Sequence, residues 1–463
     1  MMVIKLLIAI SVPFLLGVFG LTAVLKDRLA FFGYLERLAL AFAVGVWLLA
    51  LIMFSLPFVR IPLSLPTISL AAGLILLGLL PFAKEHLRLF VPGSWPRPKT
   101  TWFYVLLGLI IIKVLFAFWS ALLKPIMGPD LITYYALAAK HTFLLQAPLH
   151  LFYEPPLPFL IESWTPICLG AWQDNFLPLF SPLLFISLLI IFFSSLRRYF
   201  SDLYSIFFTF LLAGLPLLLF HAGTAYADLP QALYYSAATL YLYQFIKEFR
   251  LAPKKAYSFL LLSALLLGIS IWVKKSGIYY AGINISVLVF FAISQRENIQ
   301  KKAVLYSLLT FALVCAPWLL YSRVVVLIGS LGQALPSLHS VVVSPELLVR
   351  DMSWVVVFTM LRNMFLEGNW QLLWALCLAL AVLYPKKAFR SPAVYLSAVL
   401  LLQLAALFVL YRFTGAFQNI LNDTQLNRLM LHFAPVALYL CAGLAASDKE
   451  SHPPPATPQA SAS

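Results

Sequence analysis

The sequence predicts an all-α polytopic membrane protein, a helical bundle with about 13 transmembrane helices and amphipathic helices in its outward-facing loops. Of the 463 residues, 62% are hydrophobic and only 11% are charged. The mean hydropathy is +0.94, which excludes an ordinary soluble domain. Apolar stretches of roughly 17–25 residues recur along the chain, the length that a helix needs to cross a bilayer. Because the bilayer core offers no water to the backbone, we expect these stretches to be helical.

The expected spans follow one another with few long interruptions. They cover residues 3–25, 37–58, 64–83, 102–123, 176–194, 203–220, 229–246, 257–273, 278–294, 304–322, 370–384, 392–411 and 428–446. The long loop 124–175 follows the fourth span. The segment 351–368 is apolar but short, and Arg362, Asn363 and Glu367 crowd one end, so we expect an interfacial helix on the outer surface.

The basic residues predict the orientation of the chain. If loop 124–175 faces outward, most of the 32 Lys and Arg residues fall on the opposite side, among them Arg197, Arg198, Lys247, Lys386 and Lys387. This asymmetry is the positive-inside pattern. The net charge of +15 therefore indicates membrane topology and contact with anionic lipids, and we expect no nucleic-acid partner.

Four parts are expected along the chain. Residues 1–101 form an N-terminal three-span segment, and residues 102–326 form a transmembrane core that includes the outward loop 124–175. Residues 327–446 contain an outward interfacial segment and the last spans. The tail 447–463 is rich in Pro, Ala and Ser, a composition typical of disorder.

Asp130 is a lone acid directly after an apolar span, in the segment Gly128-Pro129-Asp130. A carboxylate close to hydrocarbon is costly, so it is a candidate functional residue. An N-cap is the alternative, and Asp suits that position. A helical run from Leu131 to Leu145 would place Asp130, Tyr134 and His141 roughly along one face. Capping and function are both open for Asp130 on this evidence.

Two further acids lie in segments expected on the same side. Glu154 precedes Pro155 and Pro156, which hold the backbone in an extended course, either as a stiff connector or to fix the carboxylate. Asp228 follows Tyr226 by two residues near the start of a span, where a cap is the simpler interpretation.

Three cations depart from the positive-inside pattern. Lys274 and Lys275 lie at the outer end of the eighth span, and Arg428 begins the last. Each side chain alone could reach toward lipid headgroups. Their position on the side of the acids favours an anionic headgroup as their ligand, since Lys and Arg both bind phosphate.

These segments together resemble the GT-C glycosyltransferases, and within them the bacterial aminoarabinose transferases and protein O-mannosyltransferase-like enzymes. The resemblance is carried by Asp130-x-x-x-Tyr134, the later Glu154-Pro-Pro, Tyr226-x-Asp228-Leu-Pro, Lys275-Ser-Gly and Arg428 before a Pro-containing span. It covers roughly residues 102–446, mostly as topology.

The resemblance implies an inverting transfer of a sugar from a polyprenyl-phosphate-linked donor to a glycan, lipid or protein acceptor. Asp130 would be the general base, with Asp228 and Glu154 as the other catalytic acids. Lys274 or Lys275, with Arg428, would neutralise the departing phosphate, and Tyr134, His141 and Tyr226 would bind substrate. No cofactor is certain, and a divalent metal at Glu154 stays open.

The resemblance also implies a location, a multi-pass protein of the bacterial inner membrane with its site facing the periplasm. The alternative function is a transporter or flippase of a lipid-linked sugar. Such a protein would normally carry its ionisable residues near the middle of the membrane, whereas these acids lie in loops. A non-catalytic relative is a third alternative, since a fold does not imply a function.

Overall fold

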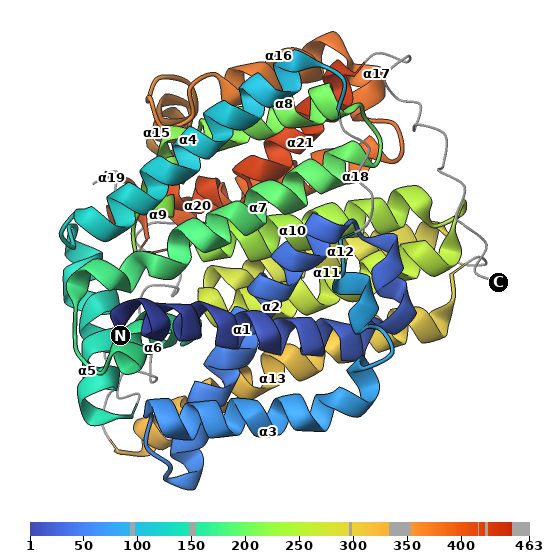
Figure 1. Cartoon of the computed structure of the whole chain (residues 1–463). Helices are drawn as coiled ribbons and strands as arrows, with labels where there is room; N and C mark the ends of the chain where they lie inside the picture. The colour runs from blue at the N-terminus through green and yellow to red at the C-terminus, as the bar shows by residue number, and fades with distance from the viewer. Residues whose placement is uncertain are drawn as a thin grey trace.

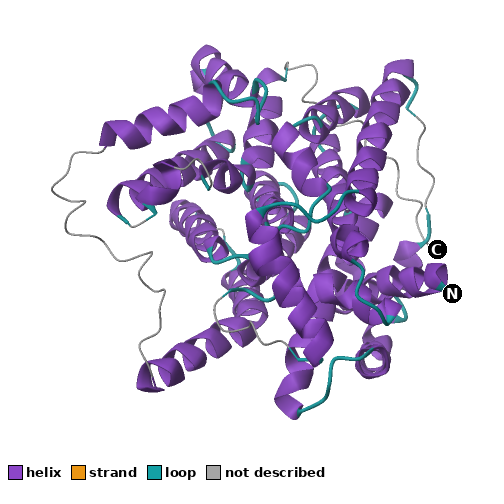
Figure 2. Ribbon diagram, turned by 90° about the vertical axis from the view of Figure 1, so that its left-hand side faces the viewer, coloured by secondary structure: helices purple, strands orange, loops and turns teal. Residues whose placement is uncertain are grey.

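The fold is known from a computed structural model. The structure describes residues 1–92, 98–147, 154–295, 299–332, 353–414, 416–421 and 425–446. Within these ranges the chain forms helices and no β-strand (Figure 2). The prediction of an all-α helical bundle is confirmed. The tail and parts of the segment 327–369 lie outside the described residues, and the division into four parts stays a prediction.

The first half of the chain contains α1 (Met2–Leu25), η1 (Lys26–Phe31), α2 (Tyr34–Ser55), η2 (Leu56–Val59), α3 (Leu65–Ala83), η3 (Leu87–Phe90), α4 (Thr101–Leu123), η4 (Leu131–Tyr135), α5 (Ala136–Leu145), α6 (Leu157–Leu169), η5 (Asp174–Leu179), α7 (Phe180–Arg197), α8 (Asp202–Ala213) and α9 (Pro216–Ala222). The second half contains α10 (Asp228–Glu248), α11 (Pro253–Val273), α12 (Ser276–Ser294), α13 (Lys301–Gly332), α15 (Ser353–Phe365), α16 (Leu373–Leu383), α17 (Pro385–Ala388), α18 (Ala393–Phe413), α19 (Phe417–Leu421), α20 (Leu426–Leu431) and α21 (Ala434–Ala445).

A helix lies at each of the 13 positions where a span was expected. Among the described residues, nine helices are long and apolar enough to cross a membrane, and α8 with α9, bent by 74°, is a tenth candidate. The protein is therefore a multi-pass integral membrane protein. Helices α16 and α21 are shorter than a full span. The expected interfacial helix is present as α15, and its position at a membrane surface stays a prediction.

Helix α10 is long enough to cross a membrane but less apolar than the other spans. It carries many polar side chains, and these point into the protein. It packs along α11, which is buried over its whole apolar stretch. The hydroxyl of Tyr235 accepts a hydrogen bond from Gln403 Nε2 (2.6 Å). Thr239 Oγ1 accepts one from Asn284 Nδ2 (3.0 Å). Such interhelical hydrogen bonds replace lipid contact, so α10 forms the centre of the bundle (Figure 1).

Helices α1 and α2 cross closely because glycines face each other. A Cβ atom at Gly17 would lie 1.7 Å from the carbonyl oxygen of Ala41, and one at Gly45 would lie 1.7 Å from that of Pro13. Small residues at helix crossings let backbones approach in a membrane, where packing drives association. This contact holds the N-terminal helix against the rest of the bundle (Figure 1).

A buried ion pair closes one end of the bundle. Glu36, at the start of α2, accepts hydrogen bonds from Arg198 Nη2 (2.5 Å) and from the Tyr241 hydroxyl (2.6 Å). Arg198 Nη1 also donates to Gln244 Oε1 (3.0 Å). These residues come from the end of α7 and the last turns of α10. They therefore mark the end of the bundle opposite to the start of α10.

The Gly17 crossing can be tested with a matched pair of glycines. We expect Gly17→Val to reduce the yield of folded protein at least tenfold, because a branched side chain would meet backbone atoms that cannot move aside. The control is Gly78→Val in α3, where a Cβ atom meets nothing within 4 Å. Size-exclusion chromatography in mild detergent measures the yield. Equal losses for the two variants would contradict the close crossing.

Candidate active site

The loop after α4 begins at a glycine that no other residue can replace without strain. Gly128 has φ of 107°, and a Cβ atom there would lie 2.2 Å from the Tyr226 hydroxyl. The expected helical run after it is confirmed, as a π-helical turn over Leu131–Tyr135 followed by α5. The glycine turn and the ring of Tyr226 together set the direction in which Asp130 leaves the helix end.

The capping interpretation of both acids is wrong. The side chain of Asp130 makes no capping hydrogen bond at the start of its helix and instead forms an ion pair with Arg428. The N-cap of α10 is Ala227, and the Asp228 carboxylate points to cations rather than to backbone amides. Long-range ion pairs therefore direct these two carboxylates, which local sequence patterns do not reveal.

Asp228 is the centre of the site. Its side chain is fully buried and accepts hydrogen bonds on both oxygens. Lys274 Nζ donates to Oδ1 (2.5 Å), and His432 Nε2 lies 3.1 Å from the same oxygen. Arg428 donates to Oδ2 from Nε (2.9 Å), and its Nη2 lies 2.9 Å from the same oxygen as an ion pair. A buried carboxylate is stable only with such partners, so Asp228 is held as an anion by two cations.

His432 belongs to this network as a neutral ring. Its Nδ1 lies 2.7 Å from the hydroxyl of Tyr280. Because an ionised carboxylate only accepts hydrogen bonds, Nε2 carries the proton toward Asp228, and Nδ1 accepts from Tyr280. The ring thereby adds a third donor to Asp228, from the residue directly after α20.

Lys274 and Lys275 serve different acids. Lys274 lies in extended backbone at the break between α11 and α12, so it and its neighbour point in different directions. Lys274 pairs with Asp228, whereas Lys275 Nζ pairs with Glu154 Oε1 at 2.7 Å. Burial lowers the pKa of Lys274, and the neighbouring Asp228 carboxylate opposes that effect. The Lys275 pair is largely exposed.

Arg428 bridges the buried and the exposed carboxylate. It pairs with Asp228 on one side and with Asp130, whose side chain is 53% exposed, on the other. The guanidinium also lies over the ring of Tyr226, 5.0 Å from its centroid. Its neighbour Asn427 donates to Glu367 Oε2 (2.7 Å) and accepts from Trp370 Nε1 (3.0 Å). These contacts fix the short helix α20 that carries Arg428.

The two expected residues on the loop helix lie beside the ion pairs. Tyr134 has a buried hydroxyl without a hydrogen-bond partner among the described residues, and its ring packs edge-on against Tyr135. Burial raises the pKa of Tyr134, and Glu154 and Glu162 add to the effect, so this hydroxyl stays protonated. His141 lies two turns further along, in α5, and is half-buried. Substrate-binding roles for both stay predictions.

Three residues of the site have no role predicted from the sequence: His432, Tyr280 and Asn427. One signal was available for His432: it follows Arg428 by four residues, which places both side chains on one helical face. Tyr280 and Asn427 carry no such signal, because their partners come from helices distant in the sequence.

The described residues do not form a group of three or more His, Cys, Asp or Glu side chains that could hold a metal ion. Glu154, the residue considered as a metal ligand, is paired with Lys275 instead.

No family model matches the chain, and no curated protein matches it. The structure is similar to the crystal structure of ArnT from Cupriavidus metallidurans bound to undecaprenyl phosphate, with a TM-score of 0.51. The chain has a GT-C-like fold. The likeness covers 76% of this chain and 62% of ArnT, so the chain spans less than two thirds of ArnT's length. At 16% sequence identity, the likeness concerns the fold alone.

Removing the central carboxylate should destabilise the protein. We expect Asp228→Asn to cost about 3–5 kcal/mol, because Lys274 and Arg428 would lose the buried anion that neutralises them. Glu154→Gln, which breaks the exposed pair with Lys275, should cost no more than about 1 kcal/mol. Both costs are measured as changes in the free energy of unfolding of the detergent-solubilised protein. If Asp228→Asn lowers the free energy of unfolding as little as Glu154→Gln does, Asp228 does not hold the site together.

Proposed function

We propose that the protein is an inverting glycosyltransferase that uses a polyprenyl-phosphate-linked sugar as donor. The acceptor is a hydroxyl group of a glycan, lipid or protein. The reaction takes place on the outer face of the membrane, which is the periplasmic face of a bacterial inner membrane. The observation that carries the proposal is the ion network in which buried Asp228 holds Lys274 and Arg428 beside the exposed Asp130.

The two cations suit the leaving group of this reaction. When the bond between the sugar and the phosphate breaks, negative charge develops on the phosphate oxygens. Fixed cations that face such charge stabilise it without reorganising, an effect worth several kcal/mol. Asp228 supplies the fixed position for Lys274 and Arg428. Asp228 is thus a positioning residue, although the resemblance lists it among the catalytic acids.

Asp130 suits the general base because it is the exposed acid of the network. It takes the proton of the acceptor hydroxyl as that oxygen attacks the anomeric carbon from the face opposite the phosphate. In the unliganded protein Asp130 is paired with Arg428. An incoming phosphate competes for the guanidinium and frees the carboxylate, so donor binding would prepare the base.

The role of Asp130 can be tested by an isosteric change. We expect Asp130→Asn to lower the rate of sugar transfer at least 100-fold, because a positioned base contributes about 10²–10⁴ in rate. Since the side chain of Asp130 is exposed, the thermal stability of the variant should match that of the parent protein. Transfer is measured with purified protein and lipid-linked sugar in detergent. Full transfer by Asp130→Asn would show that Asp130 is not the base.

The adjacent lysines provide a matched pair for the leaving-group role. We expect Lys274→Gln to lower transfer about 100-fold and Lys275→Gln to lower it less than tenfold, because only Lys274 is fixed beside Arg428 through Asp228. Initial rates at saturating donor measure the difference. The reverse order would assign the phosphate to Lys275 and Glu154.

The same preparation separates this function from lipid transport. Product formation in detergent, where no membrane separates two compartments, requires an enzyme. Movement of the lipid-linked sugar across sealed vesicles, without transfer, would instead support the flippase. The ion network lies where α10 begins rather than in mid-helix, which argues against a mid-membrane transport site.

A further inference from the structure

A second candidate binding site lies at the other end of the bundle. A cavity of about 230 Å³ is lined by three basic side chains, Lys247, Lys387 and Arg390, together with aromatic and apolar residues. None of the three forms an ion pair with a described carboxylate, and Lys247 instead lies over the ring of Tyr199, 3.4 Å from its centroid. Lys387 Nζ donates a hydrogen bond to the carbonyl oxygen of Ala446 (3.1 Å), which leaves its charge without a counter-ion, so the lining of the cavity is positively charged.

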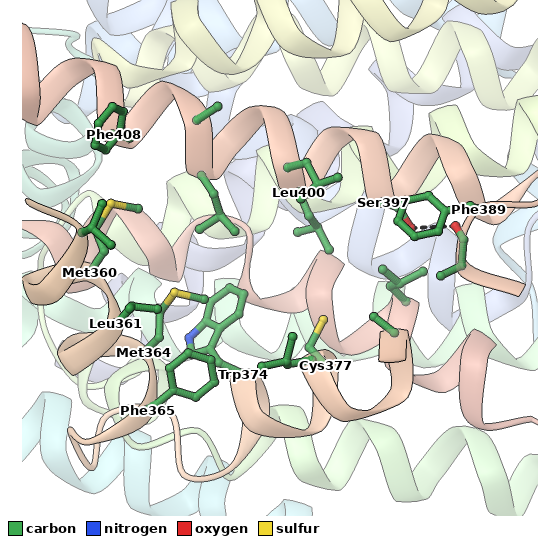
Figure 3. A pocket seen from close by; sticks show the side chains of 18 residues that line it. Met360, Leu361, Met364, Phe365, Trp374, Cys377, Phe389, Ser397, Leu400 and Phe408 are labelled. Carbon is green, nitrogen blue, oxygen red and sulfur yellow. Dashed lines mark hydrogen bonds between the residues drawn. The ribbon is translucent and has the colours of Figure 1, made fainter. Parts of the chain in front are cut away.

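A larger apolar cavity lies beside this basic cavity. It has a volume of about 570 Å³ and is lined almost entirely by hydrocarbon, from α15, α16, α18 and α21 (Figure 3). Leu440 lines both cavities, and neighbouring residues divide between them: Lys387 faces the basic cavity and Ala388 the apolar one. The two cavities therefore adjoin at Leu440, one with a charged lining and one with a hydrocarbon lining.

The dimensions of the apolar cavity match one leaflet of a bilayer. It runs along α18 from Ser397 to Phe408, as Figure 3 shows, which is about 16 Å at 1.5 Å per residue. One leaflet contributes half of a hydrocarbon core of about 30 Å. Three of its lining residues, Leu361, Leu378 and Leu401, are about half exposed, so the cavity opens at the surface of the bundle. A hydrocarbon chain can thus enter from the membrane.

The position of the basic end separates this site from the candidate active site. Lys247 lies in the last turn of α10, whereas Asp228 is its first residue, a distance of about 28 Å along the helix. The basic end is also on the side where the positive-inside pattern places the cytoplasm, and the lipids of that leaflet are the anionic ones. The ligand is therefore a lipid of the leaflet opposite to the candidate active site.

We infer that this site binds an anionic phospholipid of the inner leaflet. Its phosphate group contacts Lys387, Arg390 and Lys247, and one acyl chain fills the apolar cavity along α18. Basic pockets between transmembrane helices on the cytoplasmic side recognise such headgroups. The inference does not depend on the proposed function, because none of these residues belongs to the network of Asp228.

The headgroup end is tested by titrating fluorescent phosphatidylglycerol into the full-length protein in detergent. We expect the double variant Lys387→Gln, Arg390→Gln to bind about 30-fold more weakly, at about 1 kcal/mol for each basic residue. The control is Lys386→Gln, which neutralises the neighbouring exposed lysine, a residue that does not line the cavity. Equal weakening by the control would mean that surface charge alone attracts the lipid, and would overturn the inference.

The acyl end is tested by filling the cavity. Ala405→Phe should weaken phosphatidylglycerol binding, whereas Leu402→Phe, on the same helix but outside the cavity, should not. Unfolding in lipid-free detergent verifies that each variant is folded. Equally tight binding of phosphatidylcholine, or binding of polyprenyl phosphate in place of phosphatidylglycerol, would also overturn the inference. The Asp130→Asn variant, which should lose sugar transfer, should still bind phosphatidylglycerol as tightly as the parent protein does.

Discussion

A carboxylate removed from water at the end of a helical bundle has to be neutralised, and the neutralisation of Asp228 organises the site. Its partners come from two places far apart in the sequence: Lys274 at the end of α11, and Arg428 with His432, which lie four residues apart in and directly after α20. Each partner is held in one position by the same anion. The cost of burying the charge is offset by these ion pairs and hydrogen bonds, and the same contacts fix the positions of the two cations.

Arg428 connects this buried anchor to the surface. One guanidinium contacts a fully buried carboxylate and a half-exposed one, and a tyrosine ring covers its face. The guanidinium fork permits this, because its nitrogens point in different directions. A lysine at this position would offer a single nitrogen. The exposed carboxylate, Asp130, is thus tied to the buried network by an interaction that an anionic ligand can replace.

Helix α10 links the two ends of the molecule. Its first residue is Asp228, and its last turns contribute Tyr241 and Lys247 to the clusters at the opposite end. Between them its polar side chains bond to neighbouring helices. A helix of this composition is unstable against lipid and stable inside a bundle, which explains why it lies at the centre. The proposed active site and the lipid site are therefore both built on one rigid element.

Much of the fold could be predicted from the sequence, because a bilayer imposes length and apolarity on each span. Every expected span contains a helix, and the run after Asp130 is helical. The failures concern long-range electrostatics. Local rules assign caps to Asp130 and Asp228, whereas cations distant in the sequence hold both. The separation of Lys274 from Lys275 depends on an extended residue at a helix break, which no periodicity predicts.

We expect a specific rearrangement when the donor lipid binds. An experimental structure with bound polyprenyl phosphate should show its phosphate oxygens within hydrogen-bond distance of Lys274 and Arg428. Asp130 should have separated from Arg428, while Asp228 retains both cations. A phosphate bound elsewhere, or a phosphate bound here with the pair of Asp130 and Arg428 intact, would contradict the account.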